Sequence, residues 1–158
     1  TMYISHSTSF DLGEGPDWDG KITRLRGANF TDIKDVVVRL PRATKDHLTN
    51  SIAFGPDGMM YFNQGSQSAG GAYDGAWKRD ETLLAGAVLR LDFSKMPPEN
   101  QWPLNVQTTA TLSVINSAPS ASFIMSDGTY NPYASNSPLT IYASGLRNAY
   151  DLVWHTNG

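Results

Sequence analysis

The stretch Ile52-Ala53-Phe54-Gly55-Pro56-Asp57-Gly58 has the composition of a short β-strand that ends in a tight turn. β-Branched and aromatic residues favour strands, and Asp-Gly suits a hairpin turn because both residues tolerate positive φ. One hundred positions later, Leu152-Val153-Trp154-His155-Thr156-Asn157-Gly158 has a similar order of residue types, with Asn-Gly in place of Asp-Gly. This recurrence predicts that the two stretches occupy equivalent places in a repeated unit.

The segments between and before these two stretches also recur. Residues 60–63 resemble residues 2–5, residues 86–91 resemble residues 20–25, and residues 141–144 occupy the place of residues 36–39. The order is therefore strands two to four of one unit, a complete unit of four strands, and strand one of the next. Because four-stranded units in series are the blades of a β-propeller, we predict an all-β chain of about two four-stranded antiparallel blades. A β-sandwich whose strands are similar by chance is the alternative.

The predicted blades set the domain boundaries. Residues 2–42 supply strands two to four of one blade, residues 48–146 form a complete blade with long loops, and residues 147–158 begin the next blade. Because a propeller needs at least four blades to close, the chain is expected to be a segment of a longer protein. Residues 80–85 have the composition of a single helical turn.

The composition narrows the possible functions. The 158 residues carry 12 Lys+Arg against 15 Asp+Glu, a formal charge of −3, which disfavours nucleic acid as the main partner. The chain has no cysteine, so disulfide scaffolds, thiolate metal sites and cysteine nucleophiles are excluded. No apolar run approaches the roughly 20 residues needed to span a bilayer, so no membrane span is expected.

Reactive side chains precede both predicted first strands: His47 precedes one, and Arg147-Asn148 precedes the other. Strand one is innermost in a blade, so the topology places all three residues near the mouth of the central channel. A histidine there can act as a general base, and an arginine offers fixed donors to a carboxylate or a developing oxyanion. A loop histidine bonded to backbone, a salt bridge between blades and a turn cap are the structural alternatives.

The residues around His47 resemble a known family. The stretch Lys45-Asp46-His47-Leu48-Thr49-Asn50-Ser51-Ile52-Ala53-Phe54-Gly55-Pro56-Asp57-Gly58, followed by Tyr61 and Gly65, resembles the active-site strand of the glucose/sorbosone dehydrogenase family. Residues 87–92 and 144–152 are similar to further segments of that family, in the same order. Its members are soluble sugar dehydrogenases that depend on pyrroloquinoline quinone (PQQ) and fold as six-bladed β-propellers.

The resemblance implies a quinoprotein oxidoreductase that oxidises a small-molecule sugar by hydride transfer to PQQ. His47 is implied as the general base for the anomeric hydroxyl, Arg147 as the catalytic cation at the quinone oxygen, and Asn148 as a further contact to the cofactor. Calcium is implied as a second cofactor, with its ligands outside this segment and no metal ligand within it. An external or fused electron acceptor, the remaining blades of the parent protein and a periplasmic or secreted location follow from the same resemblance.

The loop after the second predicted strand of the complete blade supplies the substrate-loop candidates Gly65, Ser66, Tyr73 and Trp77. Family members commonly carry Gly-Asp where this chain has Gly65-Ser66, and the difference bears on substrate preference and activity. Tyr73 and Trp77 can stack on a sugar ring or pack within the loop.

Two other interpretations remain open. The alternative function is a non-catalytic β-propeller module that binds carbohydrate or protein, which Ser66 and the long loops favour. Asp74, Asp80 and Glu81 are alternative ligands for a structural calcium ion, although their spacing matches no EF-hand loop.

Overall fold

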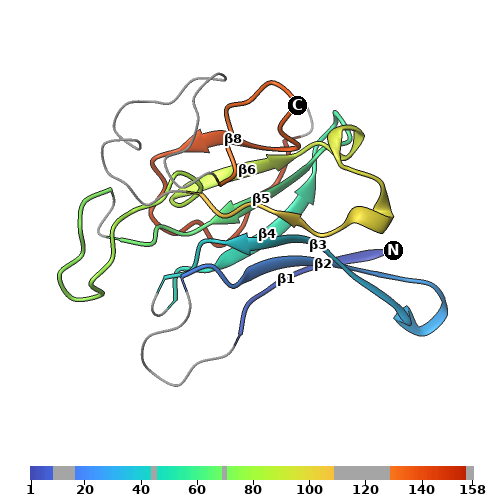
Figure 1. The fold of residues 1–158 in the computed structure, drawn as a ribbon, viewed down its shortest axis with the longest axis horizontal. Helices are drawn as coiled ribbons and strands as arrows, with labels where there is room; N and C mark the ends of the chain where they lie inside the picture. Colours follow the sequence, from blue (N-terminus) through green and yellow to red (C-terminus); the bar gives the residue numbers. More distant parts are fainter. Residues whose placement is uncertain (9–16, 44–45, 69–70, 109–128, 156–158) are drawn as a thin grey trace.

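The computed structural model describes residues 1–8, 17–43, 46–68, 71–108 and 129–155, which form two four-stranded β-sheets (Figure 1). The first sheet has the order β1-β2-β3-β7, with β1 at Met2–His6, β2 at Gly20–Arg26, β3 at Asp32–Leu40 and β7 at Leu104–Asn105. The second has the order β4-β5-β6-β8, with β4 at Thr49–Phe54, β5 at Met60–Gln64, β6 at Ala87–Leu91 and β8 at Leu139–Ser144. The helices among the described residues are three short 3₁₀ turns, η1 (Ala28–Phe30), η2 (Phe93–Lys95) and η3 (Glu99–Gln101). The all-β prediction is confirmed.

The second sheet has the strand order predicted for a complete blade. Each of its strands pairs antiparallel with the next, and the registers Phe62↔Leu89 and Leu91↔Leu139 bring apolar side chains opposite one another. In the first sheet, β1, β2 and β3 form the three-stranded antiparallel meander that the repeats predict. Both groups of strands follow from short β-branched and aromatic runs bounded by Gly, Pro, Asn or Asp.

Strand β7 was not predicted. It lies within the long connection from β6 to β8 and pairs parallel with β3 of the other sheet, through Val37↔Leu104 and Val38↔Asn105. The connection therefore passes over to the outer edge of the first sheet before the chain returns to β8. The middle of this connection, residues 109–128, lies outside the described residues.

The predicted helical turn at residues 80–85 is wrong. The chain makes a tight turn there, closed by a hydrogen bond from the Ala85 amide to the Thr82 carbonyl at 3.2 Å. Leu83 and Leu84 are buried in this turn, so apolar burial decides the conformation over local propensity. Gly86 follows with φ +60°, a left-handed conformation that favours glycine.

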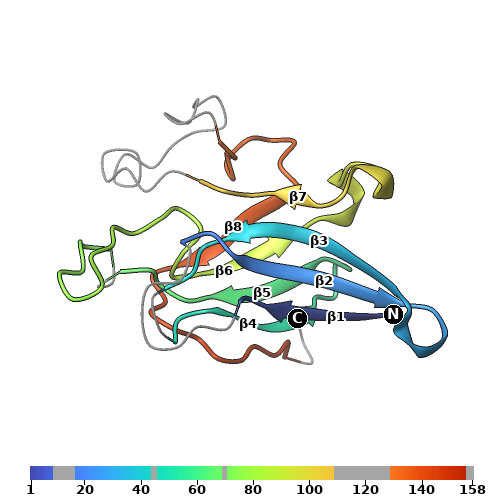
Figure 2. The same cartoon turned by 60° about the horizontal axis from the view of Figure 1, so that its bottom comes forward.

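The two sheets pack face to face and share one hydrophobic core (Figure 2). Its fully buried members include Ile22, Val36 and Leu40 from the first sheet and Phe62 and Leu89 from the second. β1 also lies beside β4, where the rings of Tyr3 and Phe54 are 5.7 Å apart. Face contact between two sheets is common to a sandwich and to neighbouring propeller blades, so closure into a propeller stays a prediction.

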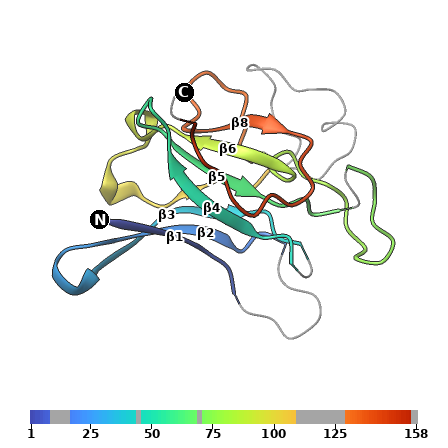
Figure 3. The same ribbon diagram turned by 180° about the vertical axis from the view of Figure 1, so that it is seen from behind.

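The segment after β8 crosses the face of the second sheet that points away from the first sheet (Figure 3). The Asn50 side chain donates to the Ala149 carbonyl at 3.0 Å, and further along a Cβ on Gly55 would lie 3.0 Å from the Trp154 ring. Asn50, in β4, contacts the earlier residue of this segment, and Gly55, just after β4, lies against the later one. Residues 149–154 therefore run in the same direction as β4. Residues 151–155 are not part of a strand in the described part of the chain, and residues 156–158 lie outside it. The predicted first strand of a further blade therefore stays a prediction.

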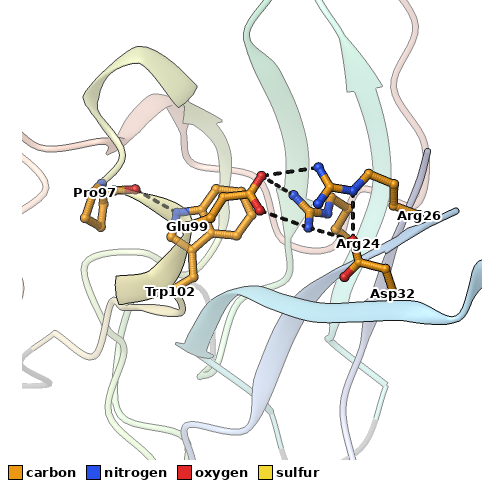
Figure 4. A network of polar contacts seen from close by, with 6 residues as sticks. All are labelled: Arg24, Arg26, Asp32, Pro97, Glu99 and Trp102. Atoms are coloured by element: carbon orange, nitrogen blue, oxygen red, sulfur yellow. Dashed lines mark hydrogen bonds and ion pairs between the residues drawn. The ribbon is translucent and has the colours of Figure 1, made fainter.

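An ionic clamp joins η3 to the first sheet (Figure 4). The Arg24 guanidinium, on a residue only 3% exposed, donates to both Glu99 carboxylate oxygens at 2.6 and 3.2 Å. It also lies 5.3 Å from the Trp102 ring centre, and Arg26 and Asp32 complete the network. This clamp holds the β6–β8 connection against β2, and with it the two sheets against each other.

The clamp makes stability depend on pH. The hydrogen bond from Arg24 holds the pKa of Glu99 below its ordinary value, against the opposing effect of desolvation. The folded protein therefore binds fewer protons at Glu99 than the unfolded chain, and this stabilisation is lost as the pH falls from the ordinary pKa of a glutamate through the lower pKa of Glu99 in the folded protein. We expect Glu99→Gln to lower the melting temperature at pH 7. Below pH 4 we expect the difference in melting temperature between the variant and the unmodified protein to become smaller. Thermal unfolding followed by circular dichroism at several pH values measures this. A constant difference at all pH values would contradict the role given to Glu99, and Gln101→Ala on the same turn serves as the control.

Candidate functional site

The main chain of Ser66 connects the three loops that carry the predicted site residues. Its amide donates to the Arg147 carbonyl at 2.7 Å, and its carbonyl lies 2.9 Å from Nδ1 of His47. Ser66 lies two residues after the end of β5 and is 1% exposed, so the sheet fixes its position. The structure thus brings the His47 ring and the Arg147 backbone to one residue, and the two loops lie near each other as the repeats predict.

The hydrogen bond to Ser66 fixes the protonation pattern of the neutral His47 ring. A backbone carbonyl only accepts hydrogen bonds, so Nδ1 carries the proton and Nε2 keeps its lone pair. Nε2 lies 4.0 Å from Oδ1 of Asp46, whose carboxylate is exposed. The His47 loop is itself closed by a bond from the Ala43 amide to the His47 carbonyl at 3.1 Å. The ring is held as a proton acceptor at Nε2.

Gly65 allows His47 and Asn148 to approach each other closely. A Cβ at Gly65 would lie 2.8 Å from Cβ of His47 and 2.9 Å from Oδ1 of Asn148, closer than carbon and oxygen atoms pack. The Gly65 amide donates to the Leu48 carbonyl at 3.0 Å, which ties the end of β5 to the start of β4. A side chain at position 65 would separate the two predicted site residues.

Both the oxygen and the nitrogen of the Asn148 side-chain amide form hydrogen bonds within the chain. Its oxygen accepts from Asn50 at 3.2 Å, and its nitrogen donates to the Asp46 carbonyl at 3.5 Å. Asn50 donates as well to the Ala149 carbonyl, a contact that sequence reasoning missed. In this structure Asn148 positions the loops around His47, and its predicted contact to a cofactor stays a prediction.

The Arg147 side chain is exposed and lines a small pocket of about 180 Å³. Ser66, Glu81 and Gly86 contribute to the same pocket, and the Leu146 amide donates to the Gly86 carbonyl at 2.9 Å to close one side. The Arg147 guanidinium has no hydrogen-bond or ion-pair partner among the described residues. The imidazole of His47 is not part of this pocket's lining.

The two aromatic residues of the substrate-loop candidates occupy different places. Trp77 lies against His47, with ring centres 5.1 Å apart and ring planes at 75°. Tyr73 is 55% exposed and has no ring contact within the part of the chain that the structure describes. The structure therefore brings His47, Gly65, Ser66, Trp77 and Asn148 together but leaves Tyr73 apart.

The alternative calcium ligands do not gather around one point. Asp74 accepts hydrogen bonds from the amides of Ala76 and Trp77, both at 2.8 Å, and so caps its own turn. Glu81 is buried and accepts from the Gln67 amide at 2.7 Å and from the Ser68 hydroxyl at 3.0 Å. In the described ranges, no three His, Asp or Glu side chains form a group that could hold a metal ion. The suggestion of a calcium ion at these three residues is wrong, because local backbone donors occupy the carboxylates of Asp74 and Glu81.

A second contact between the repeated segments lies beside the site. The Ser51 hydroxyl donates to Asp151 at 2.6 Å, and this hydrogen bond lowers the pKa of the Asp151 carboxyl. The pair joins the start of β4 to the equivalent segment one hundred positions later. It keeps the Arg147-Asn148 loop close to the His47 loop.

Comparisons of the chain with protein-family models, with curated proteins and with solved structures gave no significant match. The resemblance to glucose/sorbosone dehydrogenases therefore stays a prediction from the residues quoted above. No helix among the described residues is long and apolar enough to cross a membrane.

The close packing at Gly65 makes a testable prediction. We expect Gly65→Ala to lower the free energy of unfolding by about 1–3 kcal/mol, because the added methyl group overpacks the contact between His47 and Asn148. Gly75→Ala is the matched control, since nothing lies within 4 Å of a Cβ there. Urea denaturation of both variants gives the comparison. Equal stabilities would show that the two loops do not meet at Gly65.

Proposed function

We propose that this chain is part of a β-propeller quinoprotein that oxidises an aldose-type sugar, with His47 as the general base. The observation that carries the proposal is the pair of hydrogen bonds at Ser66. They bind the His47 imidazole and the Arg147 loop to a single residue. The sequence repeats predict this convergence independently of the family resemblance.

Two features of the fold support a propeller. The sheet β4-β5-β6-β8 is a four-stranded antiparallel meander, and β1-β2-β3 is three-quarters of a second one. Residues 149–154 run beside β4 in the same direction, which is the relation between the innermost strands of neighbouring blades. A sandwich does not require this relation between segments one hundred positions apart.

The described residues fit one part of a PQQ site. The quinone carries several carboxylates, and the Arg147 guanidinium supplies an exposed positive charge without a partner among the described residues. The pocket beside it, at about 180 Å³, is smaller than the roughly 300–1,000 Å³ of typical small-molecule sites, so it forms only one wall. Calcium ligands belong, in this proposal, to other parts of the protein.

The proposed chemistry divides between cofactor and protein. When bound, the quinone accepts the hydride from the sugar carbon. His47 takes the hydroxyl proton at Nε2, and the bond from its Nδ1 to Ser66 keeps the ring oriented. Arg147 holds negative charge on the bound ligand.

One observation favours the second candidate, a non-catalytic module that binds carbohydrate or protein. His47 is only 2% exposed and the Trp77 ring packs edge-on against it, so a substrate does not reach Nε2 without a movement of the surrounding chain. Ser66 also replaces the aspartate common in the dehydrogenases. A binding module needs no access to the imidazole.

Activity measurements separate the two candidates. The protein is expressed at the full length that its gene encodes, incubated with PQQ and Ca²⁺, and assayed for dye reduction with a panel of aldoses. We expect turnover with at least one sugar, and a loss in kcat of about 10²- to 10⁴-fold for His47→Asn, because the variant lacks the base. His155→Asn is the matched control and should keep full activity.

Two outcomes would overturn the proposal. If His47→Asn keeps full activity, His47 is not the general base, even if the protein oxidises sugars. Failure to oxidise any sugar, together with failure to bind PQQ in a fluorescence titration, would favour the binding module.

A further inference from the structure

The turn that carries Trp77 is held together by its own hydrogen bonds. The Asp74 amide donates to the Arg79 carbonyl at 2.9 Å, and the Arg79 amide donates back at 3.3 Å. The Asp74 carboxylate caps the amides of Ala76 and Trp77 inside this closed turn. Residues 74–79, here called the Trp77 tip, therefore form a small unit that can move without losing its internal bonds.

Some residues of the Trp77 tip are exposed to solvent, and Trp77 and Arg79 contact the rest of the protein through their side chains. Gly75, Ala76 and Lys78 are exposed, whereas the Trp77 ring is half-buried against His47. At the base of the tip, the Arg79 side chain forms an ion pair with Asp17. The tip is thus anchored at Arg79 and touches His47 through one aromatic ring.

Among the described residues, the end of strand β5 also packs against His47. Ser66 bonds Nδ1, and Gly65 packs against Cβ, both at the end of strand β5. Asp46, near Nε2, is exposed and 4.0 Å away, too far for a direct hydrogen bond. Trp77 is therefore the part of the enclosure that belongs to a surface turn instead of the sheet.

We propose that Trp77 is a movable cover over His47, and that the Trp77 tip swings on its Arg79 end to open Nε2 to a ligand. The ligand class rests on the proposed function: a neutral polyhydroxylated ring, whose hydroxyl reaches Nε2 and whose C–H face contacts the displaced indole. The movement itself does not depend on that function. It follows from a self-contained turn that closes over an otherwise fixed imidazole.

Chemical modification measures the movement without any turnover. Diethyl pyrocarbonate acylates the unprotonated imidazole nitrogen, which in His47 is Nε2, and peptide mass spectrometry reports each histidine separately. A minor open state populated at about 0.1–10% makes His47 react about ten- to a thousandfold more slowly than the exposed His155. We expect Trp77→Ala to bring the rate for His47 within about threefold of the rate for His155, because an uncovered ring is limited only by its own reactivity.

Matched variants identify the cover. Trp77→Phe keeps an aromatic ring and should leave His47 slow, and Tyr73→Ala should change nothing, because Tyr73 lies away from His47. Asp74→Ala removes the cap of the tip without touching His47 and should increase its rate. Because His6 is exposed in the folded protein, circular dichroism of each variant, and not a histidine rate, reports unfolding.

The proposal is overturned if His47 reacts as fast as His155 in the unmodified protein, since no cover then exists. It is also overturned if Trp77→Ala leaves His47 slow, which would mean that the sheet alone buries it. If circular dichroism shows that Trp77→Ala unfolds the protein, the tip variant Asp74→Ala decides the question: a faster His47 supports the cover, and an unchanged rate contradicts it. A positive result stands even if no aldose is oxidised.

Discussion

The main chain of Ser66 makes the two hydrogen bonds on which the candidate site depends. Its amide binds the Arg147 carbonyl and its carbonyl binds the His47 ring, so loops that are one hundred positions apart become neighbours. Both bonds use the backbone, and the Ser66 hydroxyl adds a third contact, 3.2 Å from the same Nδ1 of His47.

The sheets make this contact possible. Strand β5 delivers Gly65 and Ser66 from the centre of a buried sheet, and the shared core fixes that sheet against its neighbour. The clamp of Arg24, Glu99 and Trp102 acts from the other end of the molecule and holds the long connection from β6 to β8 in place. The Trp77 tip is different, because its backbone hydrogen bonds close within the tip, its Arg79 end is anchored to Asp17, and the Trp77 ring contacts His47. A rigid scaffold with one self-contained surface turn is an arrangement suited to controlled access.

Much of the fold follows from local sequence patterns. The apolar stretches that end at Asp57-Gly58 and similar turns predict the strands, and their order predicts which loops meet. The approach of His47 to the Arg147 loop follows from that topology alone. By contrast, β7 has two residues, too few for a period-two pattern, and its parallel pairing with β3 depends on a long-range crossing. The burial of His47 under Trp77, and of Glu81 among backbone donors, depends on how a glycine-rich loop folds back, which no local periodicity encodes.

The central claim is that Ser66 holds His47 as a proton acceptor at Nε2. Long-range ¹H–¹⁵N correlation spectra of the ¹⁵N-histidine-labelled protein, recorded at a pH where the ring is neutral, distinguish the two tautomers directly. The account predicts that His47 carries its proton on Nδ1, with Nε2 unprotonated. A proton on Nε2, with Nδ1 unprotonated, would mean that the bond to the Ser66 carbonyl does not form, and the proposed base would be lost with it.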